Sequence, residues 1–146
     1  MHRPDLTALL ERISVGTVGV TTRALAEATP GLDMTFPQWR ALLIIGATPG
    51  GARVSEVAAR VGVTLPATGR LLRRLERRGL LDLTTDPDDR RATRARLSAT
   101  GQATRDSILE YRRGMLDAVA RIVTADGTED LASGLECIAA ELERYA

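Results

Sequence analysis

The sequence predicts a mainly α-helical protein that carries one small β-hairpin, and three observations support this fold class. Apolar residues recur at helical spacing along most of the 146 residues. The apolar period shortens to two residues only on the two sides of residues 86–91. Aromatic residues make up 3% of the chain, so the core has to be built from aliphatic side chains, which favours packed helices.

Two helices are expected before residue 48. The first covers residues 5–28, where Gly16 and Gly19 each cost about 1 kcal/mol relative to alanine. "TPGLD" at 29–33 ends it. The second begins with a capping box, in which Thr35 is the N-cap and Gln38 lies three residues on, with Pro37 in the first turn. Its almost wholly apolar body, "WRALLIIGA", predicts a buried central helix.

A helix-turn-helix is expected next, after a loop at 48–52. Ser55 is expected to cap its first, short helix, which ends at Gly62. Thr64 caps the second helix, residues 65–79, with Pro66 in the first turn. Its inward stripe is Thr68, Leu71, Leu72 and Leu75, and its other faces carry Arg70, Arg73, Arg74, Arg77 and Arg78.

A β-hairpin follows at once. Leu81, Leu83 and Thr85 alternate with polar residues, and Ala95 and Leu97 do so on the return. A helix-turn-helix followed by a hairpin is a winged helix, so we call residues 81–97 the wing. Its tip consists of Asp86, Pro87, Asp88, Asp89, Arg90 and Arg91.

The remaining residues predict a long helix capped by Ser98, a break at 124–130 and a last helix with a narrow apolar seam over 131–145. These helices and residues 5–25 offer more apolar surface than so small a module needs, which favours a dimer. The expected organisation is an N-terminal dimerisation helix (1–34), a winged helix-turn-helix (35–100) and C-terminal dimerisation helices (101–146).

Composition excludes several function classes. Cys137 is the only cysteine and His2 the only histidine, which excludes an internal disulfide and argues against a zinc site or a Cys–His or Ser–His catalytic pair. We therefore expect no cofactor, no metal and no enzymatic activity. No apolar run approaches the roughly 18 residues of a membrane span, and no signal peptide opens the chain, so a cytoplasmic protein is expected.

Charge is concentrated in the middle of the chain, although the net charge is only +1. Residues 53–100 hold 11 arginines and 6 acids, a net charge of +5, whereas residues 1–52 are neutral and residues 101–146 carry −4. All 20 basic residues are arginines, whose planar fork binds phosphate and guanine bidentately. The middle segment is therefore expected to bind a polyanion.

The segments "VSEVAARVGVTLPATGRLLRRLERRGLL" (54–81) and "DPDDRRATRARLSATG" (86–101) resemble the MarR (multiple-antibiotic-resistance regulator) family of bacterial transcription factors. The matching motifs are an apolar-Ser-x-Val-Ala start, with Ser55 to Ala58, a Leu-Glu-x-x-Gly-Leu junction at 75–80, Asp-x-Arg at 89–91 and Leu-Ser-x-x-Gly at 97–101. One departure is Leu83, where many relatives carry an arginine that could brace the wing.

The resemblance implies a homodimeric repressor that binds a pseudo-palindromic operator in double-stranded DNA and is released by a small aromatic or phenolic effector. It implies effector contacts at Trp39, Arg40, Leu43 and Tyr111; the alternative for each is ordinary core packing. Relatives that sense oxidants use a cysteine near the N-terminus, where this chain has none, so Cys137 is a minor candidate for a redox role.

The wing tip and helix 65–79 supply the expected DNA contacts. Arg91 is expected in the minor groove, oriented by Asp89, with Arg90 on phosphate or in solvent. Arg70 is the expected base reader in the major groove, and Ala67 can touch a thymine methyl group. Pro66 lies on the same exposed face, Arg73 and Arg74 contact phosphate or remain solvated, and Ser55 and Thr64 cap helices with phosphate contact as a second use.

The alternative from another class is a winged helix that binds protein and no DNA. Charge placement separates the two hypotheses, because a protein-binding module does not need a net +5 concentrated in the segment that carries both the helix and the wing.

Overall fold

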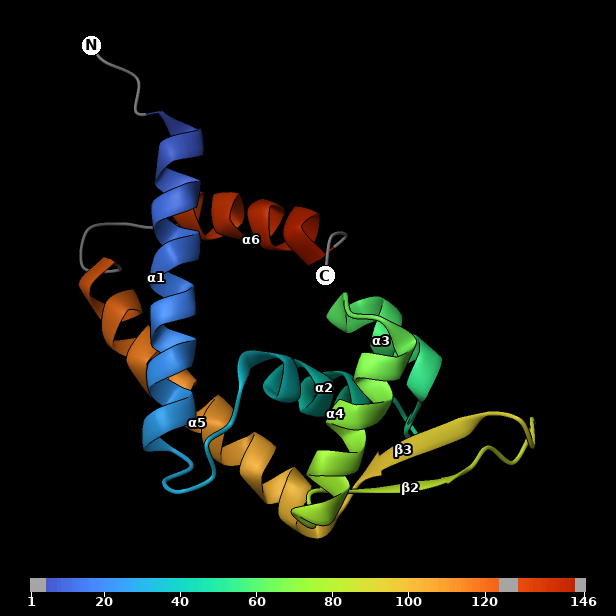
Figure 1. The fold of residues 1–146 in the computed structure, drawn as a ribbon. Coiled ribbons are helices and arrows are strands. Elements are labelled where there is room, and N and C mark those ends of the chain that lie inside the picture. The colour runs from blue at the N-terminus through green and yellow to red at the C-terminus, as the bar shows by residue number, and fades with distance from the viewer. Residues whose placement is uncertain (1–4, 124–128, 144–146) are drawn as a thin grey trace. The chain divides into compact units, whose positions relative to one another are not determined.

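The computed structural model describes residues 5–123 and 129–143 and confirms a mainly helical fold with a small antiparallel sheet (Figure 1). The chain divides into two compact units, Met1–Arg112 and Arg113–Ala146, with the boundary inside α5. The elements in order are α1 (Leu6–Glu27), α2 (Phe36–Ala47), β1 (Ala52–Arg53), α3 (Val54–Val61), α4 (Leu65–Arg77), β2 (Leu81–Thr85), β3 (Thr93–Leu97), α5 (Ala99–Val123) and α6 (Glu129–Glu143).

Three predicted helix caps are confirmed. The Thr35 hydroxyl accepts from the Gln38 amide at 3.4 Å, and the Thr35 amide donates to the Gln38 side chain at 3.0 Å, which completes the capping box. The Thr64 hydroxyl accepts from the Ala67 amide at 3.4 Å at the start of α4. The Ser98 hydroxyl accepts from the amide of Gly101 at 3.0 Å, at the start of α5.

The prediction that Ser55 caps α3 is wrong, because α3 begins at Val54 and Ser55 lies within its first turn. Arg53 holds the N-cap position, and its amide donates to the carboxylate of Glu56 at 2.7 Å. The chain enters the helix directly from β1, since Ala52 and Arg53 pair with Ala95 and Arg94. A two-residue strand shows no alternation, so the sequence pattern did not reveal it.

The sheet has the order β1-β3-β2, with both pairs antiparallel. In the wing, Leu81 lies opposite Leu97 and Thr85 opposite Thr93. Figure 1 shows this hairpin projecting from the end of α4. The wing is therefore attached at one end to the helix-turn-helix and at the other to α5.

The core of the first unit forms around α2, which contacts α3, α4 and β3 and is the predicted buried central helix. Leu72, Leu75 and Thr68 point into this core from α4, as the predicted stripe requires. The buried side chains include Trp39, Leu42, Ile45, Val57, Leu80, Leu81 and Ile108. This packing fixes the inner face of α4 and leaves its arginines outside.

The distal part of α5 and α6 form the second unit, and several of their large apolar side chains are exposed. These are Leu116, Val119, Leu131 and Leu135. The side chains of Cys137 and Leu142, residues 124–128 and Tyr145 lie outside what the structure describes. The predicted break at 124–130 is too long at its end, because α6 already begins at Glu129. Among the described helices, none combines the length and the hydropathy needed to cross a membrane.

Candidate nucleic-acid interface

A groove of about 740 Å³ lies between the start of α3, the exposed side of α4 and the wing; we call it the helix–wing groove. Three segments distant in sequence form its walls. They contribute Val54 and Ser55 from α3, Leu65, Pro66, Gly69, Arg70, Leu72 and Arg73 from α4, and Leu83, Arg91, Ala92 and Thr93 from the wing.

The groove brings together five of the ten predicted DNA-binding residues, which are Ser55, Pro66, Arg70, Arg73 and Arg91. All five are exposed. Arg70 and Arg73 line the groove from α4, and Arg91 lines it from the wing. The arrangement makes an open concave surface whose charged lining side chains are all cationic, which suits an extended polyanion.

Arg70 also borders a second, smaller hollow of about 210 Å³ on the α2 side of α4. This hollow is lined by Ala67, Leu71 and Arg74 of α4 together with Thr35, Pro37 and Gln38. Arg70 therefore stands between the two hollows, whereas Ala67 and Arg74 lie on the side away from the wing.

The other predicted residues lie outside the helix–wing groove. Thr64 caps α4, and Arg90 is exposed at the wing tip. The carboxylate of Asp89 accepts a hydrogen bond from the backbone amide of Arg91 at 3.0 Å. The expected bond to the guanidinium of Arg91 is thus replaced by one to its backbone, so Asp89 shapes the turn rather than aiming the side chain.

Asp86 is the principal site residue that the sequence reasoning missed. Its side chain is fully buried at the base of the wing tip and is paired with two arginines. Arg53 donates through Nε at 3.0 Å and Nη2 at 3.3 Å, and Arg94 through Nη2 at 2.7 Å and Nε at 2.9 Å. We call these three residues the Asp86 clamp. It joins the wing to β1.

The clamp lowers the pKa of Asp86 far below the usual range of a carboxyl group. The main cause is the hydrogen bond from Arg53, to which the amide of Asp88 and the side chain of Arg94 add, while burial acts in the opposite direction. Asp86 is therefore ionised at neutral pH.

This shift predicts an acid-sensitive contribution to folding. The pKa of Asp86 is lower in the folded than in the unfolded chain. The ionised carboxylate therefore contributes fully to the free energy of unfolding above about pH 4, and this contribution declines as the pH falls toward the folded pKa. We expect the difference in unfolding free energy between the wild type and Asp86→Asn to be constant from about pH 8 to about pH 5 and to shrink below about pH 4. Urea unfolding across this range measures it, and a pH-independent difference would contradict the assignment.

Three of the four residues predicted to bind an effector pack in or against the core. Trp39 is only 1% exposed within the core, and Leu43 and Tyr111 are half-buried against it. Arg40 donates to the carbonyl oxygen of Arg60 at 2.7 Å. None of these four lines any of the three cavities described in this section.

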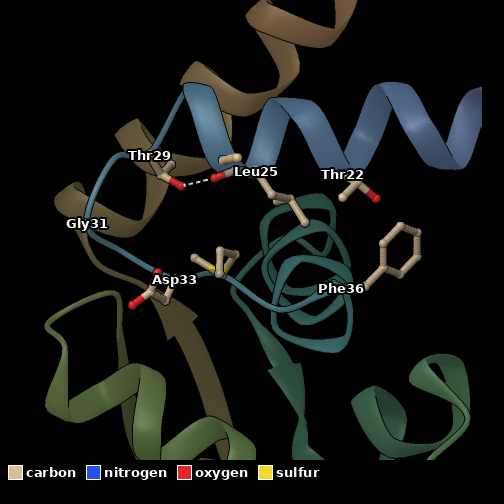
Figure 2. A pocket seen from close by; sticks show the side chains of 8 residues that line it. Thr22, Leu25, Thr29, Gly31, Asp33 and Phe36 are labelled. Carbon is tan, nitrogen blue, oxygen red and sulfur yellow. Dashed lines mark hydrogen bonds between the residues drawn. The ribbon is translucent and has the colours of Figure 1, made fainter.

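A separate pocket of about 410 Å³ lies between the end of α1 and the segment leading into α2 (Figure 2). Leu25, Met34 and Phe36 supply apolar surface there, and Thr22 and Asp33 supply polar groups. Figure 2 shows the Thr29 hydroxyl on one wall, donating to the carbonyl oxygen of Leu25 at 2.6 Å. The hydroxyl of Thr29 is thus already engaged by the last turn of α1.

A helix-turn-helix, a β-hairpin and a basic groove between them define a winged helix-turn-helix protein. Residues 32–92 match the model of the MarR family. The chain is 24% identical over 125 residues to the HTH-type transcriptional repressor IacR of Pseudomonas putida, a match that spans 86% of this chain and 74% of that protein. The chain is thus similar to MarR-family transcriptional regulators, and the family model matches it over the helix-turn-helix and most of the wing.

Solved structures share the fold over nearly the whole chain. RV1404 from Mycobacterium tuberculosis has a TM-score of 0.79 at 22% identity, covering 96% of this chain and 95% of that one. A mutant of S. aureus MepR bound to an oligodeoxyribonucleotide has a TM-score of 0.67 at 20% identity, covering 96% and 99%. MepR bound to ethidium bromide has a TM-score of 0.63 at 20% identity, covering 93% and 95%. The curated relatives are regulators and not enzymes.

Proposed function

We propose that this protein is a homodimeric repressor that binds a pseudo-palindromic operator through α4 and the wing. The observation that carries the proposal is the helix–wing groove, where Arg70 and Arg73 of α4 and Arg91 of the wing line one concave surface. Two relatives support it, because IacR is a transcriptional repressor by name and MepR has been solved with an oligodeoxyribonucleotide.

In this proposal α4 enters the major groove, which is about 12 Å wide and admits a helix. The buried face of α4 is held by Leu72 and Leu75, so its exposed face can approach the bases without disturbing the core. Arg70 reads a guanine bidentately, since its side chain is exposed where α4 lines the helix–wing groove. Pro66 and Ala67 approach the bases beside it, and Thr64, Arg73, Arg74 and Ser55 contact phosphates.

The wing tip enters the adjacent minor groove in the same proposal. Arg91 is inserted there, where the negative potential of a narrow groove attracts a guanidinium without base-specific hydrogen bonds. Asp89 supports this role because its carboxylate accepts from the backbone amide of Arg91. Arg90, which is exposed at the wing tip, contacts phosphate in this proposal.

Dimerisation is proposed through residues 1–34 and 101–146, which flank the DNA-binding segment 35–100. In α1 the exposed apolar side chains include Leu6, Ile13 and Val15, the last 73% exposed. Exposing so many large apolar groups to water along one helix is unfavourable for a monomer, and such a surface is typical of a protein–protein interface. A two-fold dimer would bury them and present two α4 helices to half-sites about 34–36 Å apart.

Release of DNA by a small aromatic effector is the regulatory part of the proposal. MepR has been solved with ethidium bromide, an aromatic compound. Trp39, Arg40, Leu43 and Tyr111 are the proposed contacts, and since Trp39 is buried, a ligand that reaches it has to displace core packing. Such a ligand releases DNA by favouring a conformation in which the two α4 helices no longer match the half-sites.

Replacement of Arg91 by alanine tests the minor-groove contact. Loss of a charged contact should weaken operator binding by about 1–2 kcal/mol, a factor of about 5–30, with no change in the circular dichroism spectrum or in the oligomeric state. Arg60→Ala removes the same charge from the exposed last turn of α3, outside the helix–wing groove and the proposed dimerisation segments, and should leave affinity unchanged. Electrophoretic mobility shifts on an operator duplex measure both variants, and equal affinities would refute the wing contact.

A further inference from the structure

We propose that Asp86 is a positioning residue for DNA recognition, which clamps the wing so that Arg91 is held across the helix–wing groove from α4. This inference rests on the proposed function, because Asp86 would affect DNA binding only through the position of Arg91. Asp86 lies in the most basic segment of the chain, where a carboxylate would otherwise repel the phosphates of DNA.

The side-chain contacts of Asp86 span the junction between wing and helix-turn-helix. Its Oδ2 accepts from Arg53 Nε at 3.0 Å and from Arg94 Nη2 at 2.7 Å. Arg53 is the N-cap residue of α3, and Arg94 belongs to β3 and also donates to the carbonyl oxygen of Gly51 at 2.9 Å. One buried carboxylate therefore connects three segments.

The same carboxylate also builds the turn that carries Arg91. Its Oδ1 accepts from the backbone amides of Asp88 at 2.9 Å and Asp89 at 3.2 Å. The Asp86 amide donates to the carbonyl oxygen of Ala92 at 2.9 Å, which closes the tip around Arg91. The conformation of the backbone that presents Arg91 thus depends on Asp86.

The clamp joins two opposite walls of the helix–wing groove. Val54 and Ser55, which follow Arg53 directly, line the α3 side of the groove, and Arg91 and Thr93 line the wing side. Because Asp86 bonds to both Arg53 and the wing, it sets the position of one wall relative to the other. A buried carboxylate that accepts hydrogen bonds from four residues holds this geometry more rigidly than exposed ion pairs do.

The effect of Asp86 on DNA affinity distinguishes a positioning role from a simple effect of its charge. Removing a negative charge from a DNA-binding surface should by itself strengthen binding to any duplex. If Asp86 positions Arg91, its removal instead weakens binding to the operator, so the two effects have opposite signs. Asp88 is the matched control, because it is exposed in the same wing tip and its replacement by asparagine changes the charge equally.

The test is a double-mutant cycle of Asp86→Asn and Arg91→Ala on the full-length protein. Its probe is a duplex that the wild type selects from random DNA, compared with a scrambled duplex. We expect Asp86→Asn to weaken selected-duplex binding at least about tenfold, and less than about twofold when Arg91 is already alanine. Asp88→Asn should not weaken binding to either duplex. Arg53→Gln, which breaks one side of the clamp, should give a smaller loss that also disappears in the Arg91→Ala background, and it serves if Asp86→Asn does not fold.

Two results would overturn the proposal. A loss of equal size in the presence and absence of Arg91 would mean that Asp86 supports the fold without acting through Arg91. Equal behaviour of Asp86→Asn and Asp88→Asn would mean that the clamp does not affect recognition. Failure of the wild type to select any duplex would be a different outcome, because it would refute the proposed function itself.

Discussion

Replacement of Arg70 by alanine is expected to weaken operator binding by about 1–3 kcal/mol and to relax the sequence preference at one base position in each half-site. The reason is geometric. Arg70 is exposed between the helix–wing groove and the hollow beside α2, whereas the α4 residues Thr68 and Leu72 are buried beneath it. It is the arginine closest to the N-terminal turn of α4, the part of a recognition helix that contacts base edges.

Competition binding to operators with every substitution at each position measures this effect. Arg77→Ala is the matched control, since Arg77 is an exposed arginine in the last turn of α4 and lines none of the three cavities described above. Its loss should weaken binding to all sequences alike or not at all. An Arg70→Ala protein that retains the wild-type base preference would remove Arg70 as a base reader.

Replacement of Gly101 by alanine should cost at least about 1–3 kcal/mol of folding free energy. Gly101 lies in the first turn of α5, where a β-carbon would collide with the backbone carbonyl of Leu80. Ser98 holds the two segments together, because its amide donates to the same Leu80 oxygen at 3.1 Å and its hydroxyl to that of Gly79 at 2.5 Å. No side-chain rotation can relieve a clash with backbone, so the start of α5 has to move away from β2.

Gly69→Ala provides the control for this prediction. Gly69 lies within α4, and a β-carbon there has no neighbour within 4 Å in the described part of the chain. Alanine at Gly69 should therefore stabilise the protein by about 0.5–1 kcal/mol through helix propensity alone. Thermal unfolding without DNA compares the two variants, and a Gly101→Ala protein as stable as the wild type would contradict the close contact.

The features that the sequence predicted correctly are those that depend on neighbours along the chain. The caps at Thr35, Thr64 and Ser98 each join residues three apart, so the pattern of residue types contains them. The inward face of α4 follows in the same way from its helical period. Even the location of the wing turn is a local property, because Asp86 precedes a proline.

The missed features depend on segments that only the fold brings together. Arg53 and Asp86 are 33 residues apart, and their pairing requires β1, which is too short to show a pattern. Counted from the sequence, Arg53 and Arg94 were two more positive charges available for DNA, whereas both are engaged by a buried carboxylate. The net charge of the segment was thus counted correctly. The count did not show that Arg53 and Arg94 are paired with Asp86.

The central claim is that the helix–wing groove binds operator DNA, and a salt-resolved fluorescence anisotropy titration tests it most directly. The probe is a duplex from the promoter region upstream of the protein's own gene, with a scrambled duplex as the control. We predict tight, promoter-selective binding that weakens by about 0.9 log unit per log unit of salt for each phosphate neutralised. Weak binding that is equal on both duplexes, followed by failure to recover any site from fragments of the whole genome, would contradict the claim and favour a winged helix that binds protein.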